Sequence, residues 1–107
     1  MKIEINEEKY DELQDGLIDY LTKRIKSILE EKEVAEESIY DITGDLVFEI
    51  AAIIDSSAIM GTEEDPILPF LAFSKSESER DSLIADVGGS SLHEKAYGTV
   101  EQIFEIE

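Results

Sequence analysis

The chain has 107 residues, and its 27 Asp and Glu against nine Lys and Arg give a formal net charge of -18 at pH 7. This length allows one hydrophobic core of ordinary size, and the absence of cysteine excludes disulfides and thiolate chemistry. A surface this acidic repels phosphate backbones and anionic lipids. Direct nucleic-acid binding and membrane binding are therefore the least expected functions. A basic protein surface or a divalent cation would gain from this charge.

The N-terminal sequence MKIEINEEKY has no apolar stretch after its basic residue and therefore does not read as a targeting signal. The longest apolar stretch, residues 46–54, is interrupted by Glu49 and is shorter than the roughly 20 residues of a membrane-spanning helix. Because 42% of the residues are apolar and lie in groups, the chain can form a core. We therefore expect one acidic helical domain, residues 1–107, in the cytoplasm.

The first predicted elements are a short strand and a long helix. Residues 2–5 alternate between polar and apolar, which predicts a strand with Ile3 and Ile5 on one face. Apolar residues then recur at helical spacing over residues 7–33, and Asn6 has a side chain suited to capping the first turn.

A second long helix is predicted from Ser38 to about Ala58. Ser38 and Asp41 have the spacing of a capping box, and Gly61 can end the helix. Apolar residues follow the cap at helical intervals, namely Ile39, Ile42, Leu46, Ile50 and Ile53. The second half is apolar nearly all round, so we expect it to lie in the centre of the fold or in an oligomer interface.

The next segment contains two prolines. Pro66 and Pro69 push the residues before them towards extended conformations, so we expect an extended segment at residues 67–73, paired with residues 2–5. The alternative is a short helix capped by Asp65, with Pro66 at its first position.

A third, short helix is predicted after this segment. Ser76 and Glu79 have capping-box spacing, Leu83 and Val87 belong to a narrow apolar face, and Gly88-Gly89 can end a helix.

A fourth helix is predicted from Ser91 to the C-terminus, because Ser91 and Glu94 repeat the capping spacing and apolar residues follow at helical intervals. The alternative is a terminal strand at residues 99–106. The predicted fold class is mainly α, with α+β as the alternative: an antiparallel pair of long helices, two shorter helices and at most a small two-stranded sheet.

Acidic residues form a row on each long helix, because residues four apart are neighbours on a helix surface. The rows are Glu7, Asp11, Asp15 and Asp19 on the first helix and Glu37, Asp41, Asp45 and Glu49 on the second. Glu49 lies among apolar residues and is left out of the predicted surface. A different interpretation is that acids favour the start of a helix and that any chain this acidic forms such rows by chance.

Motifs for catalysis or metal binding are incomplete. A helical di-iron site needs Glu-x-x-His, and the only histidine, His93, has Ser90 three residues earlier. His93 has neither a second histidine nor a cysteine to complete a zinc site. Glu12 and Asp15 supply one carboxylate pair for a magnesium site, while the second helix spaces its acids by four. No catalytic residue, metal site or cofactor is therefore predicted.

From these patterns we expect a non-catalytic acidic interaction protein, an inhibitor or immunity-like antagonist of a basic protein. The predicted contacts are Glu7, Asp11, Asp15, Asp19, Glu37, Asp41 and Asp45. The first alternative is a small metal-dependent hydrolase that uses helix carboxylates. The second is a structural subunit of a homo-oligomer, in which the apolar helix pairs with its own copy across a two-fold axis.

Overall fold

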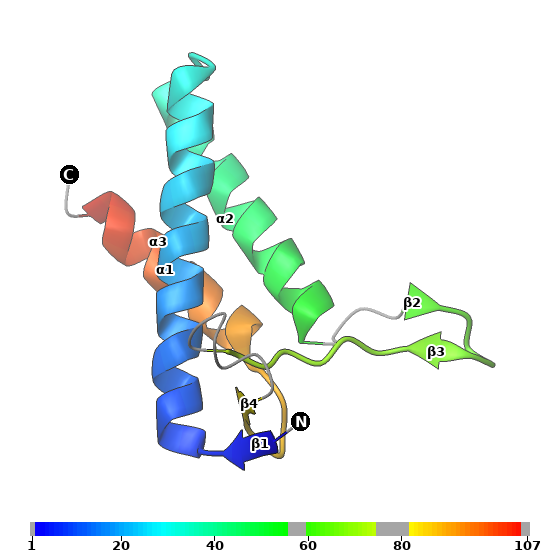
Figure 1. Cartoon of the computed structure of the whole chain (residues 1–107). Coiled ribbons are helices and arrows are strands. Elements are labelled where there is room, and N and C mark those ends of the chain that lie inside the picture. Colours follow the sequence, from blue (N-terminus) through cyan, green and yellow to red (C-terminus); the bar gives the residue numbers. More distant parts are fainter. Residues whose placement is uncertain (1, 56–59, 75–81, 106–107) are drawn as a thin grey trace.

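The protein is mainly helical, with three helices and two small sheets in the part of the chain that the structure describes (Figure 1). The structure, a computed structural model, describes residues 2–55, 60–74 and 82–105. The elements in chain order are β1 (Lys2–Ile5), α1 (Glu7–Glu31), α2 (Glu36–Ile54), β2 (Met60–Gly61), β3 (Pro66–Ile67), β4 (Ser82–Ala85) and α3 (Leu92–Glu105).

Helix α1 confirms the first predicted helix and its cap. The side chain of Asn6 accepts a hydrogen bond of 3.1 Å from the backbone N–H of Lys9, which satisfies one of the free donors of the first turn. The helix ends at Glu31, slightly before the predicted end, because Glu33 has a φ of 59° and lies in the left-handed region.

Helix α2 begins at Glu36, so the predicted capping box of Ser38 and Asp41 is wrong. Ala35 occupies the cap position and makes no side-chain hydrogen bond there. Glu36 and Glu37 stand in the first turn instead, where their charge favours the helix dipole. The helix ends at Ile54, before the predicted end, and residues 56–58 of the prediction lie outside the described residues.

The N-terminal strand pairs with a segment far along the chain. Strand β1 runs parallel to β4, with Ile3 opposite Leu83 and Ile5 opposite Ala85. The predicted pairing of residues 2–5 with residues 67–73 is therefore wrong. Along β4, Ile84 belongs to a buried cluster with Tyr10, while the neighbouring Leu83 lies opposite Ile3 on the other face of the sheet.

The third predicted helix is wrong where it can be compared, because residues 82–85 form strand β4. The rest of that prediction, residues 76–81, lies outside the described residues. Two hydrogen bonds between the backbones of Phe73 and Ile84, of 3.0 and 2.8 Å, join the second edge of β4 to the preceding segment. As a strand, β4 forms backbone hydrogen bonds along both of its edges, with β1 on one side and with Phe73 on the other. A helix over the same residues could not form these bonds.

The proline-containing segment is extended only in part. Strands β2 and β3 form a short antiparallel hairpin that projects away from the helices in Figure 1. Gly61 lies in this hairpin rather than at the end of a helix, and its φ of 80° and the carbonyl oxygen of Asp65, 2.6 Å from where a Cβ would lie, require glycine. The alternative helix capped by Asp65 is absent from the described residues, since Asp65 belongs to the turn of the hairpin.

Helix α3 confirms the predicted C-terminal helix, and the alternative strand at residues 99–106 is wrong over the described residues 99–105. Each helix contacts the other two, and α3 crosses behind α1 in Figure 1. The main core lies among the three helices and consists of Ile18, Val47, Ala51, Leu92, Ala96 and Val100. The antiparallel arrangement of α1 and α2 remains a prediction.

A second, smaller core lies between α1 and the sheet. It consists of Tyr10 from α1 and Ile84 and Ala85 from β4, with Phe73 packed edge-on against the Tyr10 ring. The sheet therefore holds the segment after β4 close to the first turns of α1. No helix in the described ranges has the length and apolar character needed to cross a bilayer.

Candidate functional site

The acidic row on α1 is partly paired with the protein's own lysines. The Nζ atom of Lys95, on α3, lies 2.8 Å from a carboxylate oxygen of Asp11 and 2.8 Å from one of Asp15. Lys23 pairs with Asp19 at 2.9 Å. Burial alone would lower the pKa of Lys95, but the two carboxylates outweigh it and raise the pKa above its ordinary value. Three of the four carboxylates in this row, those of Asp11, Asp15 and Asp19, are therefore ion-paired with a lysine of the same chain.

The row on α2 is different. Glu37, Asp41 and Asp45 are exposed, and they project away from the helix face that enters the core through Ile39 and Val47. Within the described ranges, no Lys or Arg lies within ion-pair distance of these three carboxylates. This row therefore presents uncompensated charge to solvent.

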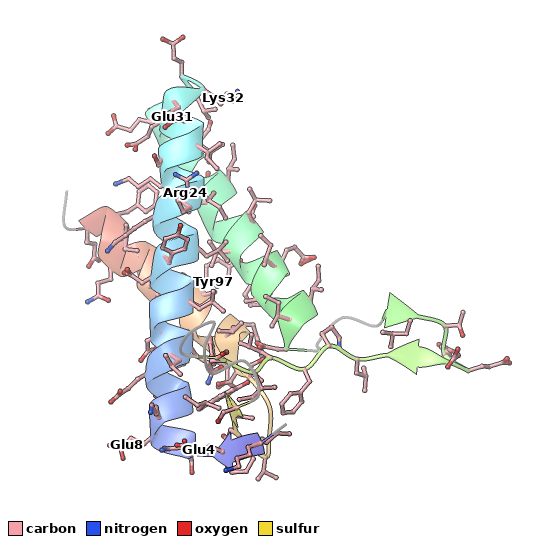
Figure 2. All side chains as sticks on the ribbon, viewed as in Figure 1. Glu4, Glu8, Arg24, Glu31, Lys32 and Tyr97 are labelled. Carbon is pink, nitrogen blue, oxygen red and sulfur yellow. The ribbon has the colours of Figure 1, made fainter. Side chains whose placement is uncertain are left out.

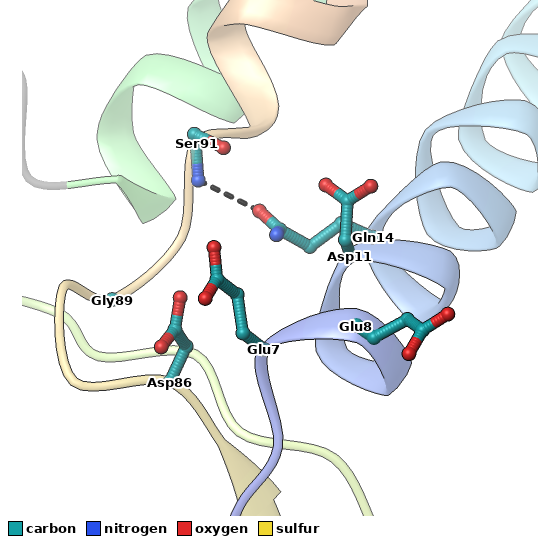
Figure 3. Close-up of a pocket in the computed structure, with 7 residues that line it drawn as sticks. All are labelled: Glu7, Glu8, Asp11, Gln14, Asp86, Gly89 and Ser91. Carbon is teal, nitrogen blue, oxygen red and sulfur yellow. Dashed lines mark hydrogen bonds between the residues drawn. The ribbon is translucent and has the colours of Figure 1, made fainter.

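An open pocket of about 440 Å³ lies between the start of α1 and the loop that follows β4. Glu7, Glu8, Asp11, Gln14, Asp86, Gly89 and Ser91 line it (Figure 3). Of the seven residues predicted to bind a partner, Glu7 and Asp11 belong to this pocket, and the other five do not line it. Among the described residues that line it, none is basic, although Asp11 also contacts Lys95.

The carboxylates differ in how they meet this pocket. Figure 3 shows Glu7 and Asp86 pointing toward the same space between α1 and the loop, whereas Glu8 points away from it. Like charges that share one concave space repel each other, and a cation placed between them would relieve this repulsion. The pocket is therefore suited to an ammonium or guanidinium group.

Hydrogen bonds hold the loop that forms one wall of the pocket. The buried side chain of Gln14 accepts a 2.7 Å bond from the backbone N–H of Ser91. Asp86 accepts a 2.8 Å bond from the N–H of Val87 with its side chain, and Gly89, with a φ of 74°, completes the turn. The wall thus keeps a defined position relative to α1.

The sequence did not predict five of the lining residues, of which Asp86 matters most because its carboxylate points into the pocket with that of Glu7. Its local signal was an Asp before Val-Gly-Gly, a pattern typical of turns because the Asp side chain bonds to the following backbone. That pattern predicts a turn but not a pocket. Its place beside Glu7 follows from the parallel pairing of β1 with β4, which no local pattern indicates.

A buried network of hydrogen bonds lies next to this loop. The carboxylate of Asp55, with 1% of its side chain exposed, accepts bonds from the Ser90 hydroxyl at 2.5 Å and from the backbone N–H of His93 at 2.7 Å. Its second oxygen also lies 2.6 Å from Nδ1 of His93. Burial alone would raise the pKa of Asp55, but the bonds from Ser90 and His93 prevail and lower it below its ordinary value.

The side chain of Tyr10 binds the segment that precedes Phe73. Its hydroxyl donates a 2.6 Å hydrogen bond to the carbonyl of Leu71. Burial, followed by the negative charges of Asp55 and Asp86, raises the pKa of Tyr10 and outweighs the opposing hydrogen bond with Ser90. The tyrosine is therefore a neutral donor at physiological pH, and its bond fixes the segment before Phe73.

The serine, histidine and aspartate of this network do not have the arrangement of a nucleophile and its base. In a catalytic triad the serine hydroxyl bonds to the imidazole, whereas Ser90 donates to Asp55 here. In the described ranges, no group of three or more His, Asp or Glu side chains is placed to hold a metal ion. The network acts as a structural link between α2, the loop and α3.

Comparison of the chain with protein-family models, curated proteins and solved structures finds no match.

Proposed function

We propose that this chain is a non-catalytic acidic interaction protein, an inhibitor or immunity-like antagonist that acts in the cytoplasm on a basic partner protein. The observation that supports it is the pocket into which Glu7 and Asp86 point, with Asp11 at its wall and no Lys or Arg among its described lining residues. In this proposal a Lys or Arg side chain of the partner enters the pocket.

The exposed row on α2 supplies a second contact in this proposal. Glu37, Asp41 and Asp45 form no ion pair with a Lys or Arg in the described part of the chain, so their charge is available to a basic surface. Asp15 and Asp19 contribute less, because Lys95 and Lys23 already screen them. The proposal takes α1 and α2 as the antiparallel pair predicted from the sequence.

Long-range attraction would govern how such a complex forms. A net charge of -18 steers a cationic partner toward the chain and raises the association rate, and added salt screens this field. Binding must therefore weaken as salt rises, mainly through slower association.

The test is the binding of a fluorescent peptide rich in Lys, Arg and Ser, followed by anisotropy at about 50 and about 300 mM salt. We expect Glu7→Gln with Asp86→Asn to weaken binding roughly tenfold, because both removed charges face the pocket. The control is Glu31→Gln with Glu101→Gln, which removes the same charge from exposed positions outside it; Figure 2 shows Glu31 at the far end of α1 from Glu8.

Three results would count against the proposal. The first is no binding of the basic peptide at low salt, and the second is binding that ignores salt. The third is an equal loss of affinity in the pocket variant and the control variant, because the effect would then come from net charge and not from the pocket.

A further inference from the structure

One face of the small β1–β4 sheet is apolar and, among the described residues, largely exposed at Ile3 and Ile5. Ile3 and Leu83 are paired across the two strands, and so are Ile5 and Ala85, so their side chains lie on the same face. Together with Phe70, Ala72 and Val87 they line an open groove of about 440 Å³.

The groove leaves large apolar side chains in contact with water. The exposed fractions are 60% for Ile3, 56% for Ile5, 62% for Phe70 and 81% for Val87. The opposite face of the sheet is covered, since Ile84 packs against Tyr10 and Phe73 in the smaller core. A contiguous exposed apolar patch beside a polar rim is typical of an interaction site.

The groove lies along β1, which is an edge strand of the sheet in the described part of the chain. Strand β1 pairs with β4 on one side, and no other strand of the described residues pairs with it. The outer edge of β1 therefore presents backbone N–H and C=O groups that an added strand can bind. Such a strand would place every second side chain over the groove.

The negative charge around the groove favours a basic occupant. Asp86 lines both the groove and the acidic pocket, so the two hollows adjoin there. A second copy of this chain would bring another charge of -18 to the same surface. A segment with apolar residues and a Lys or Arg complements both hollows at once.

We propose that β1 accepts an extended segment of the partner protein, with apolar side chains in the groove of Ile3, Ile5 and Val87 and a basic side chain in the adjoining pocket. This proposal rests on the proposed function for the basic residue and adds the apolar and backbone parts of recognition. It identifies the partner's contact as a strand of alternating apolar and basic residues.

The probe is a fluorescent peptide of about eight residues that alternates Lys and Val, a length typical of a strand. Its first control replaces every Val by Ser and keeps the charge. Its second control carries N-methyl groups on alternate amides, in both registers, which removes the donors that pair with β1. We expect either change to weaken binding at least tenfold, because one removes apolar burial and the other backbone pairing.

Variants of the protein locate the contact. Ile3→Ser with Ile5→Ser, and separately Val87→Ser, should weaken the Lys-Val peptide severalfold while leaving the Lys-Ser peptide unchanged. These side chains are largely exposed, and the circular dichroism spectrum checks that each variant keeps its fold. Val87→Ser keeps the test valid if the double change disturbs β1.

The outcomes separate the two proposals. If the Lys-Ser and Lys-Val peptides bind equally well and weaken with salt, the strand proposal is wrong while the proposed function survives. If neither basic peptide binds, the proposed function fails as well. A dimer in light scattering that Ile3→Ser with Ile5→Ser abolishes, with no peptide binding, would show that the groove belongs to a second copy of the chain.

Discussion

The Asp55 carboxylate accepts a hydrogen bond of 2.7 Å from the backbone N–H of His93, so the residue that follows α2 caps the start of α3. A capping side chain usually comes from the residue just before the helix, whereas this one comes from the residue that follows another helix. The bond therefore fixes the relative position of α2 and α3 as well as the first turn of α3.

Loss of this cap should destabilise the fold. We expect Asp55→Asn to lower the free energy of unfolding by about 1–3 kcal/mol, because a buried charged acceptor is removed and its donors lose strength. Urea denaturation followed by circular dichroism measures the change. Asp45→Asn, an exposed change of the same kind on α2, should stay within about 0.5 kcal/mol of the wild type. Equal effects of the two changes would show that the cap contributes nothing.

Asp55 should also make stability depend on acid pH. Its pKa in the folded state lies below the ordinary value of 3.8, so the stabilisation is fully present above that value. It is lost as the pH falls through the folded-state pKa. The difference in unfolding free energy between the wild type and Asp55→Asn should therefore shrink as the pH falls below about 4. A difference that grows below about pH 4 would contradict this sign.

A buried hydroxyl offers a stabilising substitution. Thr43 is fully buried in α2, and its Oγ1 atom has no hydrogen-bond partner among the described residues. We expect Thr43→Val to raise the free energy of unfolding by about 1 kcal/mol, since it removes an unsatisfied polar group and keeps the shape.

The matched control for this change is Thr22→Val on α1. Thr22 is equally buried, but its hydroxyl donates a 2.7 Å bond to the carbonyl of Ile18. This variant should be neutral or less stable, because a formed hydrogen bond is removed. Thermal melting compares the two, and a destabilised Thr43→Val would mean that its hydroxyl is satisfied in solution.

Lys95 gives a test of the charge distribution. Lys95→Gln removes the cation shared by Asp11 and Asp15, so we expect the basic peptide to bind severalfold more tightly at low salt. The stability loss should stay below about 1 kcal/mol, because both carboxylates are more than half exposed. Lys23→Gln removes the same charge next to Asp19, and it should raise peptide affinity less because Asp19 does not line the pocket. Measuring the affinity of the basic peptide for both variants tests whether Lys95→Gln has the larger effect.

The sequence predicts best the elements whose signals are local. Helix α1 has its cap, Asn6, and its apolar spacing within one stretch of chain, and both are as predicted. The cap predicted at Ser38 fails because a helix does not need a side-chain cap when acids occupy its first turn. The mainly α class and the C-terminal helix are confirmed for the same local reasons.

Other features depend on partners that are distant in the sequence. Leu83 and Ile84 fit a helix and a strand equally well over so short a run, and pairing with residues 2–5 decides for the strand. Asp55 and Asp86 become a cap and a pocket residue only when the folded chain brings α3 and α1 to them. Two of the acidic residues predicted as contacts line the pocket because they lie in the first two turns of α1.

The parallel pairing of β1 with β4 has a consequence for synthesis of the chain. The N-terminal strand leaves the ribosome first, but the residues that bind it are translated only after α1 and α2 are complete. Closing so long a loop is slow compared with forming local helices. A nascent chain arrested before Ser82 can therefore form α1 and α2 but neither α3 nor the parallel sheet, and Ile3 and Ile5 remain unpaired until β4 has been translated.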